Sequence, residues 1–231
     1  MSLDLLFADT AVEIIPPDLV KRLQATRRHR MTSPNGELLD IADHNFAMQD
    51  IPDKEQRGRP DILHHCLLNT LDTPLARSGN LEVYFHLRDD PVYHIAPETR
   101  IPRNYNRFLG VVTQLLQKDH VPGEKPFHMA KVAGNLAEFL NLRQYDHVCI
   151  FSRTGKIFDL SAHFAQAING KWLCVIGAFQ GGFFQARTLQ ELNKKPSHLM
   201  SISPLGLSAG TVASRVTYAY EMATKCEPRK I

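Results

Sequence analysis

Cysteine is scarce in this sequence of 231 residues, and the four that occur lie far apart. They are Cys66, Cys149, Cys174 and Cys226, and no two of them form a Cys-x-x-Cys pair. That spacing excludes a disulfide framework. Cys149 and Cys174 stand inside apolar runs, where a reduced and buried thiol is expected, so we expect a reducing compartment.

The sequence also lacks a membrane segment and a strong charge of either sign. No apolar stretch approaches the roughly 20 residues that a helix needs to cross a bilayer. The first ten residues, MSLDLLFADT, carry acids where a signal peptide needs a basic start. We therefore expect a cytoplasmic protein with no membrane partner. The formal net charge is only +3, so any affinity for nucleic acid depends on local clusters of basic residues.

Motifs for the commonest cofactors and for metals are missing as well. Neither glycine-bearing loop near the C-terminus has the pattern Gly-x-Gly-x-x-Gly or Gly-Lys-Ser/Thr, which disfavours an NAD or ATP site. There is no His-Glu-x-x-His, and His64, His65 and Cys66 are adjacent, so on a helix they point in different directions. We expect no metal, and no serine or cysteine stands in a recognisable nucleophile elbow.

The hydrophobic pattern that is present predicts strands alternating with helices. Strands are predicted within residues 2–10, 81–87, 92–97, 147–152, 171–179 and 199–203, and helices within residues 59–72, 104–118, 156–168 and 210–226. Pro122-Gly123 is expected to end the second helix. The alternation favours an α/β fold with a mostly parallel sheet flanked by helices. The length suits a single domain, with residues 21–57 interpreted as an insertion or mobile flap.

Two glycine-bearing loops follow predicted strands near the C-terminus. One contains Gly177, Gly181 and Gly182, and the other contains Gly206 and Gly210. In open α/β sheets, ligands bind beyond the carboxyl ends of strands, and glycine lets the backbone approach them closely. Tight turns require glycine too, so the loops by themselves do not decide between a ligand site and a structural role.

The segment RGRPDI places an acid at a predicted helix start. Pro60 suits the first turn of a helix, which puts Asp61 near the positive end of the helix and near Arg59. That environment favours the carboxylate, which then suits orienting an N–H donor more than removing a proton. An aspartate at a helix start without any chemistry is the alternative.

Three arginines lie within the ten residues TRIPRNYNRF. Arg103 and Arg107 are four apart, so on a helix they share a face, and Arg100 stands at its entry. Guanidinium groups suit bidentate phosphate contacts, and Tyr105 among them suits stacking on a base. A solvated helix face would carry the same charges, and this stretch alone leaves both interpretations open.

Taken together, four blocks resemble one family. RGRPDILHHCLLNTLDTPLARSGNLEVYFH, TRIPRNYNRFLGVVTQLLQ, VIGAFQGG and MSISPLGLSAG are similar to the pseudouridine-N1-specific methyltransferases of small-subunit ribosomal RNA, in their compact archaeal form. The resemblance covers about residues 57–225. It implies the α/β fold of the SPOUT class with a C-terminal trefoil knot, and a homodimer that binds S-adenosylmethionine and methylates N1 of a pseudouridine in small-subunit rRNA.

The resemblance also implies roles for individual residues. Those matched to catalysis are Asp61 and Arg59, and those matched to RNA binding are Arg59, Arg100, Arg103 and Arg107. Those matched to the cofactor site are Ile176, Gly177, Ala178, Gly182, Ile202, Leu205, Leu207, Ser208 and Ala209. Two features depart from the family pattern: residues 21–57, and Gly206, where many relatives have a larger residue.

Two functions of other classes remain as alternatives. One is a non-catalytic factor that binds rRNA during assembly of the small subunit, a role that the resemblance implies beside methylation. The other is a metabolite enzyme that uses a dinucleotide. Added methyl mass on a pseudouridine-bearing RNA separates the first alternative from the methyltransferase, and stabilisation by NAD rather than by S-adenosylmethionine identifies the second.

Overall fold

The computed structural model describes residues 2–25, 36–165 and 170–224. The strands are β1 (Leu3–Thr10), β2 (Leu81–Leu87), β3 (Val92–Ile95), β4 (His120–Val121), β5 (Met129–Ala133), β6 (His147–Ile157), β7 (Trp172–Gly177) and β8 (Ser197–Ser201). The helices are α1 (Pro17–Ala25), α2 (Ile41–His44), the 3-10 helix η1 (Lys54–Gln56), α3 (Pro60–Leu71), α4 (Pro74–Arg77), α5 (Tyr105–Lys118), α6 (Leu136–Leu142), α7 (Leu160–Ala165), α8 (Ala186–Leu192) and α9 (Ala209–Thr224).

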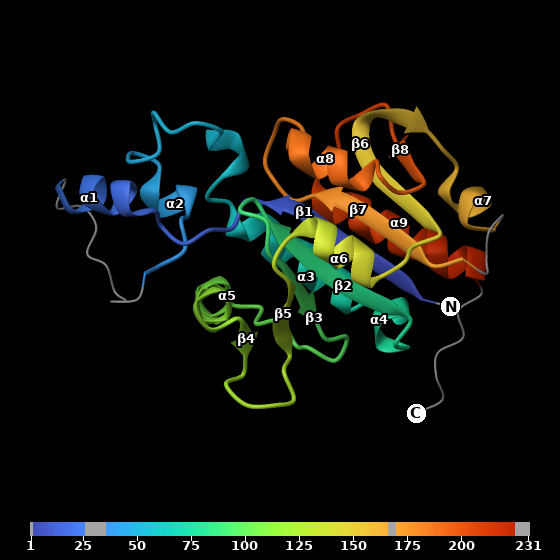
Figure 1. Cartoon of the computed structure of the whole chain (residues 1–231), viewed down its shortest axis with the longest axis horizontal. Coiled ribbons are helices and arrows are strands. Elements are labelled where there is room, and N and C mark those ends of the chain that lie inside the picture. The colour runs from blue at the N-terminus through green and yellow to red at the C-terminus, as the bar shows by residue number, and fades with distance from the viewer. Residues whose placement is uncertain (1, 26–35, 166–169, 225–231) are drawn as a thin grey trace.

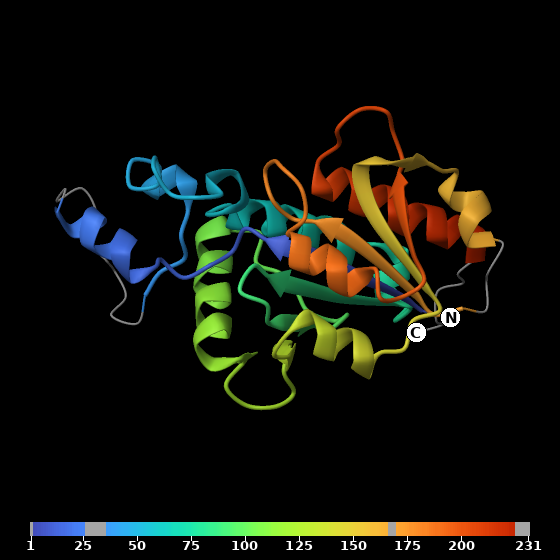
Figure 2. The same ribbon diagram turned by 45° about the horizontal axis from the view of Figure 1, so that its top comes forward.

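One eight-stranded sheet organises the fold, in the order β4-β5-β3-β2-β1-β7-β6-β8. The adjacent pairs β2–β1, β1–β7, β7–β6 and β6–β8 are parallel. Beyond β2 the sheet continues through β3, β5 and β4 in antiparallel pairs. Helices cover both faces of the twisted sheet (Figures 1 and 2). The predicted α/β fold with a mostly parallel sheet flanked by helices is therefore confirmed. The trefoil knot stays a prediction.

The central strand β1 explains why two cores form. All eight of its residues are buried, and successive side chains point to opposite faces of the sheet. Leu3, Leu5 and Phe7 pack into the core beneath α3, α5 and α9, whereas Leu6 and Ala8 pack into the core beneath α6 and α8. A continuous apolar run is what a strand covered on both faces requires.

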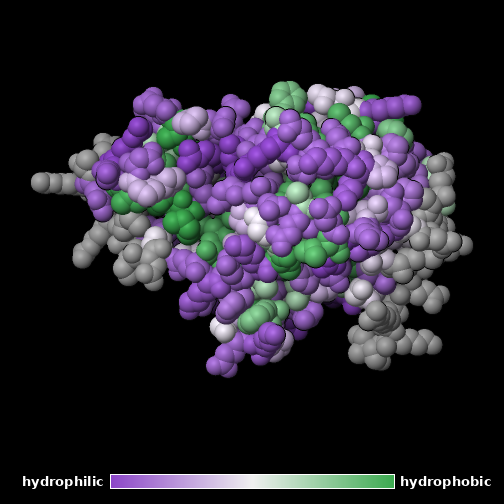
Figure 3. Space-filling view, viewed as in Figure 1, coloured by the Kyte–Doolittle hydropathy of each residue, from purple (hydrophilic) through white to green (hydrophobic). Residues whose placement is uncertain are grey.

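Residues 36–58 and α1 form a small unit of their own that projects from one end of the sheet (Figures 1 and 2). Its hydrophobic cluster comprises Ile15, Leu19, Leu23, Leu39, Ala47, Met48 and Ile51. On the face drawn in Figure 3, hydrophobic side chains gather where this unit meets the rest of the fold. The part of segment 21–57 that is described is thus folded around its own core, while residues 26–35 lie outside the described residues. Its mobility stays untested.

Several element boundaries differ from the predictions. The helix predicted from residue 104 ends at Lys118, before Pro122-Gly123, because Asp119 adopts a left-handed conformation (φ 61°) and its N–H bonds to Leu115 O. The helix predicted over 156–168 begins only at Leu160, since β6 continues to Ile157, and residues 166–169 are not described. Strands β4 and β5 and helices α6 and α8 were not predicted.

Two expectations about thiols and membranes can be compared with the structure. Cys149 and Cys174 are free and buried, as predicted for reduced thiols; Cys66 is free and buried as well, and Cys226 lies outside the described residues. Among the helices of the described ranges, none is both long and apolar enough to cross a membrane.

Candidate functional site

A cavity of about 520 Å³ opens beyond the carboxyl ends of β7 and β8 and beside the middle of β6. Its walls are the loop after β7 (the β7 loop, residues 178–185), the loop after β8 (the β8 loop, residues 202–208), residues 151–153 of β6, and the start of α3. Clefts of this size commonly hold small organic ligands. The position is the one at which open α/β sheets bind them.

Eight of the nine residues matched to a cofactor site line this cavity: Ile176, Gly177, Gly182, Ile202, Leu205, Leu207, Ser208 and Ala209. Ala178 does not. It is fully buried behind the cavity, where its N–H donates to Ala8 O and its carbonyl accepts from Ala11 N, both at 3.0 Å. These two bonds fix the beginning of the β7 loop to the end of β1.

The glycines of the two loops differ in whether a larger residue could replace them. Gly182 has φ 94°, in the region that side-chain-bearing residues rarely adopt, and a Cβ there would lie 2.8 Å from Gln56 Nε2. Gly206 has ordinary φ, and a Cβ there would meet nothing within 4 Å. The β7 loop therefore requires its glycine, whereas open space next to the cavity would accept a larger residue at position 206.

Segment 53–57 lies against the β7 loop. Gln180 N donates to Glu55 O at 3.2 Å, and Gln56 Nε2 donates to Phe183 O at 2.7 Å. The segment is held in turn by Arg57, whose guanidinium forms a fork with Glu13 at 2.7 Å for both bonds. The unit formed by α1 and residues 36–58 thus reaches one wall of the cavity.

Arg59 and Asp61 form an ion pair at the start of α3. Arg59 Nε and Nη2 donate to the two carboxylate oxygens of Asp61 at 2.8 and 2.7 Å. These hydrogen bonds hold the pKa of the Arg59 guanidinium above its usual value. Its third nitrogen, Nη1, donates to Gln180 Oε1 at 2.6 Å. This hydrogen bond joins the ion pair to the β7 loop, which forms one wall of the cavity. Asp61 itself does not line the cavity; its carboxylate is joined to the cavity through Arg59, which does.

The arginine stretch 99–108 packs against α3. His64 Nε2 lies 2.7 Å from Pro102 O, and the His64 ring stacks on Phe108 at 4.3 Å between centroids. Tyr105 OH donates to Asp40 Oδ2 at 2.5 Å, and burial followed by this hydrogen bond raises the pKa of Tyr105. The stretch therefore joins α3 to segment 36–58, and Phe108 is a core residue, as expected.

The three arginines of this stretch do not lie on one helical face. Helix α5 begins at Tyr105 and is capped by Asn104, so Arg103 precedes the helix, and the predicted sharing of a face with Arg107 is wrong. Arg100 lines a second cavity of about 380 Å³ with Glu98, a cavity whose lining does not include Arg59. All three are exposed, and within the described ranges none of them forms an ion pair.

Arg153 and Phe183 line the cavity and were not singled out in the sequence. The guanidinium carbon of Arg153 lies 5.7 Å from the centroid of the exposed Phe183 ring. Besides Arg59, Arg153 is the other cation of the lining, and among the described residues it has no ion-pair partner. Ser152-Arg153-Thr154 is a polar run inside β6, directly after its apolar residues. In the sequence, this change from apolar to polar residues was the signal for polar side chains at the site.

Metal binding has no visible basis in the part of the chain that is described: no three His, Cys, Asp or Glu side chains lie together in a way that would hold an ion. The cavity is lined by loop backbone, apolar side chains, serines, Gln180 and two arginines.

Comparisons with known proteins agree on one family. Residues 5–221 match the family described as EMG1/NEP1 methyltransferase. The chain is 33% identical over 223 residues to the ribosomal RNA small subunit methyltransferase Nep1 of Pyrococcus furiosus, covering 95% of this chain and 96% of the relative. It is 34% identical over 223 residues to the protein of the same name from Methanothrix thermoacetophila, with 95% of each covered.

A solved structure is similar over the whole fold. It is that of Archaeoglobus fulgidus Nep1 bound to S-adenosylhomocysteine, with a TM-score of 0.82 and 31% sequence identity. The match covers 98% of this chain and 100% of the other. Segment 36–58 and α1 therefore lie within the matched length.

Proposed function

The chain belongs to the EMG1/NEP1 methyltransferase family, and on that premise we propose that it methylates N1 of a pseudouridine in small-subunit ribosomal RNA, with S-adenosylmethionine as the methyl donor. The observation that carries the proposal is the cavity beyond β7 and β8. A family member with the same fold is known with S-adenosylhomocysteine bound, the product that a methyl donor of this kind leaves.

The residues of the cavity fit S-adenosylmethionine. Leu205, Leu207 and Ile202 offer apolar contacts to an adenine ring, and the backbone around Gly182 offers hydrogen bonds without side-chain obstruction. Arg153 is a cation without an ion-pair partner among the described residues and suits the carboxylate of the donor's amino-acid part. No phosphate-binding motif is needed, because the donor carries no phosphate.

Bound there, S-adenosylmethionine would supply an activated methyl group: the N1–C bond would form as the S–C bond breaks, the electron pair of that bond would stay on sulfur, and the N1 proton would pass to water. The protein's part is then to hold the base and the donor in line. Asp61, paired with Arg59 at the cavity edge, would accept the N1–H hydrogen bond and orient the ring. Uridine has carbon at that ring position and offers no such hydrogen.

RNA binding would involve the exposed arginines near the site. Arg103 and Arg107 flank the start of α5, and Tyr105 between them is tied to the unit that borders the cavity. Guanidinium contacts to phosphates fix the register of the RNA, whereas the target base must be splayed out of a loop to reach the donor. Arg100, which borders the second cavity, would contact the RNA farther along its backbone.

The assembly and location of the protein belong to the proposal too. A homodimer would cover exposed apolar side chains, among them Tyr218 and Met222, which lie one turn apart on α9. Since small-subunit rRNA is the proposed substrate, we propose a cytoplasmic site of action and a part in small-subunit assembly.

The decisive experiment is a turnover assay. The protein is incubated with S-adenosylmethionine and a short loop RNA that contains either pseudouridine or uridine at one position, and the nucleosides are weighed. We expect one added methyl group on the pseudouridine and none on the uridine. Tight RNA binding without added methyl would refute the proposal and favour the assembly factor without catalysis.

Asp61→Asn tests the role of the carboxylate. We expect kcat to fall by about tenfold to hundredfold with unchanged RNA affinity, because the charged acceptor of the N1–H hydrogen bond is replaced by a neutral one. Asp72→Asn is the matched control, since Asp72 ends the same helix and is also paired with an arginine, Arg77. Full activity of Asp61→Asn would remove Asp61 from the mechanism.

A further inference from the structure

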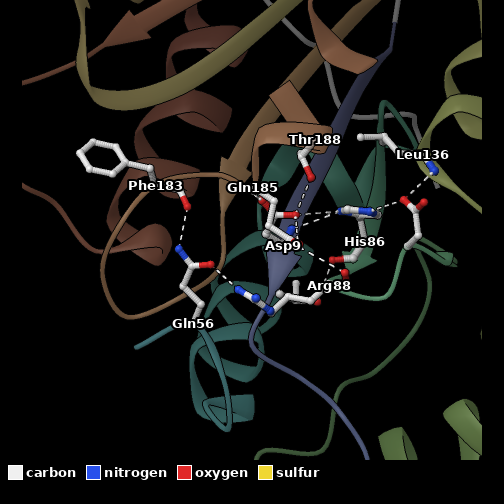
Figure 4. Close-up of polar contacts among 10 residues, drawn as sticks. Asp9, Gln56, His86, Arg88, Leu136, Phe183, Gln185 and Thr188 are labelled. Atoms are coloured by element: carbon white, nitrogen blue, oxygen red, sulfur yellow. Dashed lines mark hydrogen bonds and ion pairs between the residues drawn. The ribbon is translucent and has the colours of Figure 1, made fainter. Parts of the chain in front are cut away.

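Asp9 is a fully buried acid at the end of β1 that sequence reasoning did not single out. Its backbone adopts a left-handed conformation, φ 50°. Its carboxylate accepts three hydrogen bonds: from Thr188 Oγ1 at 2.7 Å, from Gln185 N at 2.7 Å and from Gln185 Nε2 at 3.2 Å (Figure 4). A buried carboxylate is costly unless it is hydrogen-bonded in this way. Backbone strain of this kind occurs most often at functional sites, which makes the buried Asp9 a candidate for a functional role.

Of the two partners of Asp9, Gln185 is the last residue of the β7 loop and Thr188 lies in the first turn of α8, directly after it. The same strand end that holds Ala178 through Ala8 and Ala11 therefore holds Gln185 through Asp9. Between these two anchors, the loop lines the cavity. Release of the Asp9 anchor would leave the loop held by Ala178 and by its contacts with Glu55, Gln56 and Arg59.

A second set of contacts joins the same loop to segment 53–56. Gln185 Nε2 also donates to Arg88 O at 3.2 Å, and the Arg88 guanidinium donates to Gln56 and to Asp53. Gln56 then donates to Phe183 O (Figure 4). The contacts Gln185–Arg88–Gln56–Phe183 form a ring that the backbone of residues 183–185 completes, so the end of the loop is enclosed. Asp9 is attached to this ring at Gln185, on its buried side.

The other side of Asp9 is fixed as well. Asp9 N donates to Nδ1 of the buried His86 at 3.3 Å, and His86 Nε2 lies 3.1 Å from Asp90 Oδ1. His86 Nδ1 also lies 3.5 Å from Asp9 Oδ1, so the His86 ring stands between the carboxylates of Asp9 and Asp90. Asp90 Oδ1 in turn accepts from Leu136 N at 3.3 Å. The acid is thereby tied to the start of α6 and has little freedom to follow the loop.

We propose that Asp9 is a positioning residue for the methyl donor, which it does not touch: through Gln185 and Thr188 it holds the β7 loop in the shape that binds S-adenosylmethionine. This inference rests on the proposed function of the cavity. It assigns to the end of β1 a part in donor affinity, separate from its part in the sheet.

The test compares two buried aspartates of one strand. Asp9→Asn keeps the left-handed backbone, which asparagine tolerates, and keeps an acceptor for Gln185 N, while it removes an acceptor on the side of Thr188 and the Gln185 amide. Asp4→Asn is the matched control. Asp4 is 1% exposed at the opposite end of β1 and accepts from Tyr145 OH at 2.7 Å.

Calorimetric titration with S-adenosylhomocysteine is the first measurement. We expect the dissociation constant of Asp9→Asn to rise by about tenfold, the value of roughly one lost hydrogen bond to a charged group, and that of Asp4→Asn to stay within about twofold. Thr188→Val, which removes one donor from the loop side, should also weaken binding. In turnover, KM for S-adenosylmethionine should rise in Asp9→Asn while kcat and KM for RNA are unchanged.

A double variant tests the path. Gln185→Met removes the side-chain amide that Asp9 holds, so Asp9→Asn combined with Gln185→Met should weaken binding less than the sum of the two single effects. If folded Asp9→Asn and Thr188→Val bind S-adenosylhomocysteine as the wild-type protein does, Asp9 is structural only and the inference fails. If the wild-type protein itself does not bind, the proposed function fails and the inference with it.

Discussion

Gly155 in β6 packs against the backbone of β8, whose residues Met200 and Ser201 line the cavity, and replacing it with alanine tests the geometry of the site. A Cβ at Gly155 would lie 2.4 Å from the carbonyl carbon of Met200 and 2.6 Å from its oxygen. Both are backbone atoms of β8, so no side chain can rotate away.

The magnitude follows from the displacement that Gly155→Ala forces. Carbon atoms in contact stay about 3.5 Å apart, so β8 must move by about 1 Å. Near this point Lys156 pairs with Met200, and Phe158 N donates to Ser201 O at 3.1 Å. A shift of that size breaks two or three backbone hydrogen bonds, each worth about 1 kcal/mol, for a total loss of about 2–3 kcal/mol in the free energy of unfolding.

Two measurements check the prediction. For a chain of this length, a loss of about 2–3 kcal/mol lowers the melting temperature by roughly 4–12 °C. Affinity for S-adenosylhomocysteine should fall together with stability, because the displaced strand carries one wall of the cavity. Gly206→Ala is the matched control: it borders the same cavity, and a Cβ there meets nothing within 4 Å. If Gly155→Ala and Gly206→Ala were equally harmless, the close packing of β8 against β6 would be refuted.

Three further predictions concern charge. Arg103→Glu should weaken RNA binding and lower the slope of its salt dependence by about 1, with S-adenosylhomocysteine binding unchanged; filter binding at several salt concentrations measures this, with Arg77→Glu as the control. Arg153→Ala should weaken S-adenosylhomocysteine binding by about three- to tenfold in calorimetry and Arg153→Lys by less, and equal affinities would exclude contact with the donor's carboxylate. The hydrogen bond with His86 lowers the folded-state pKa of Asp90 below 3.8, so its stabilisation is present above that pH and is lost as the pH falls through the folded-state pKa. Urea unfolding from about pH 5 to 2.5 should therefore show a steeper acid loss for the wild-type protein than for Asp90→Asn.

The parts of the fold with strong hydrophobic patterns were predictable from sequence. β1, β2, β7 and α3 combine apolar runs or periodicity with clear ends, such as Pro60 at the first turn of α3. β4 and β5 contain two and five residues, and so short a pattern does not separate a strand from a loop. The last residue of α5, Lys118, agrees with the prediction, but the helix is ended by Asp119 in a left-handed conformation rather than by Pro122-Gly123, and no local pattern marks that conformation.

The candidate site was predictable only in part, for a different reason. Motif resemblance identified the two loops, whose residues are close in sequence. The proposed role of Asp9 depends on its hydrogen bond with Gln185, which is 176 positions away in the sequence, and no local pattern marks that contact. Arg153 was overlooked because the apolar run of β6 ends before it, whereas the strand continues on the strength of pairing with β8. The positions of both residues therefore depend on contacts between segments that are far apart in the sequence.

The central place of β1 has a consequence for the way the protein is made. Leu3 pairs with Leu81 on one side and with Trp172 on the other. At a synthesis rate of about 5–20 residues per second, β1 leaves the ribosome roughly 8 to 34 s before its second neighbour, β7. During that time it is an apolar strand with a free edge, the kind that pairs with other chains. Asp4 and Asp9 carry charge in the unfolded chain, and charges within a strand oppose such pairing. Asp9, which binds the β7 loop in the folded protein, thus also opposes pairing of the nascent strand with other chains.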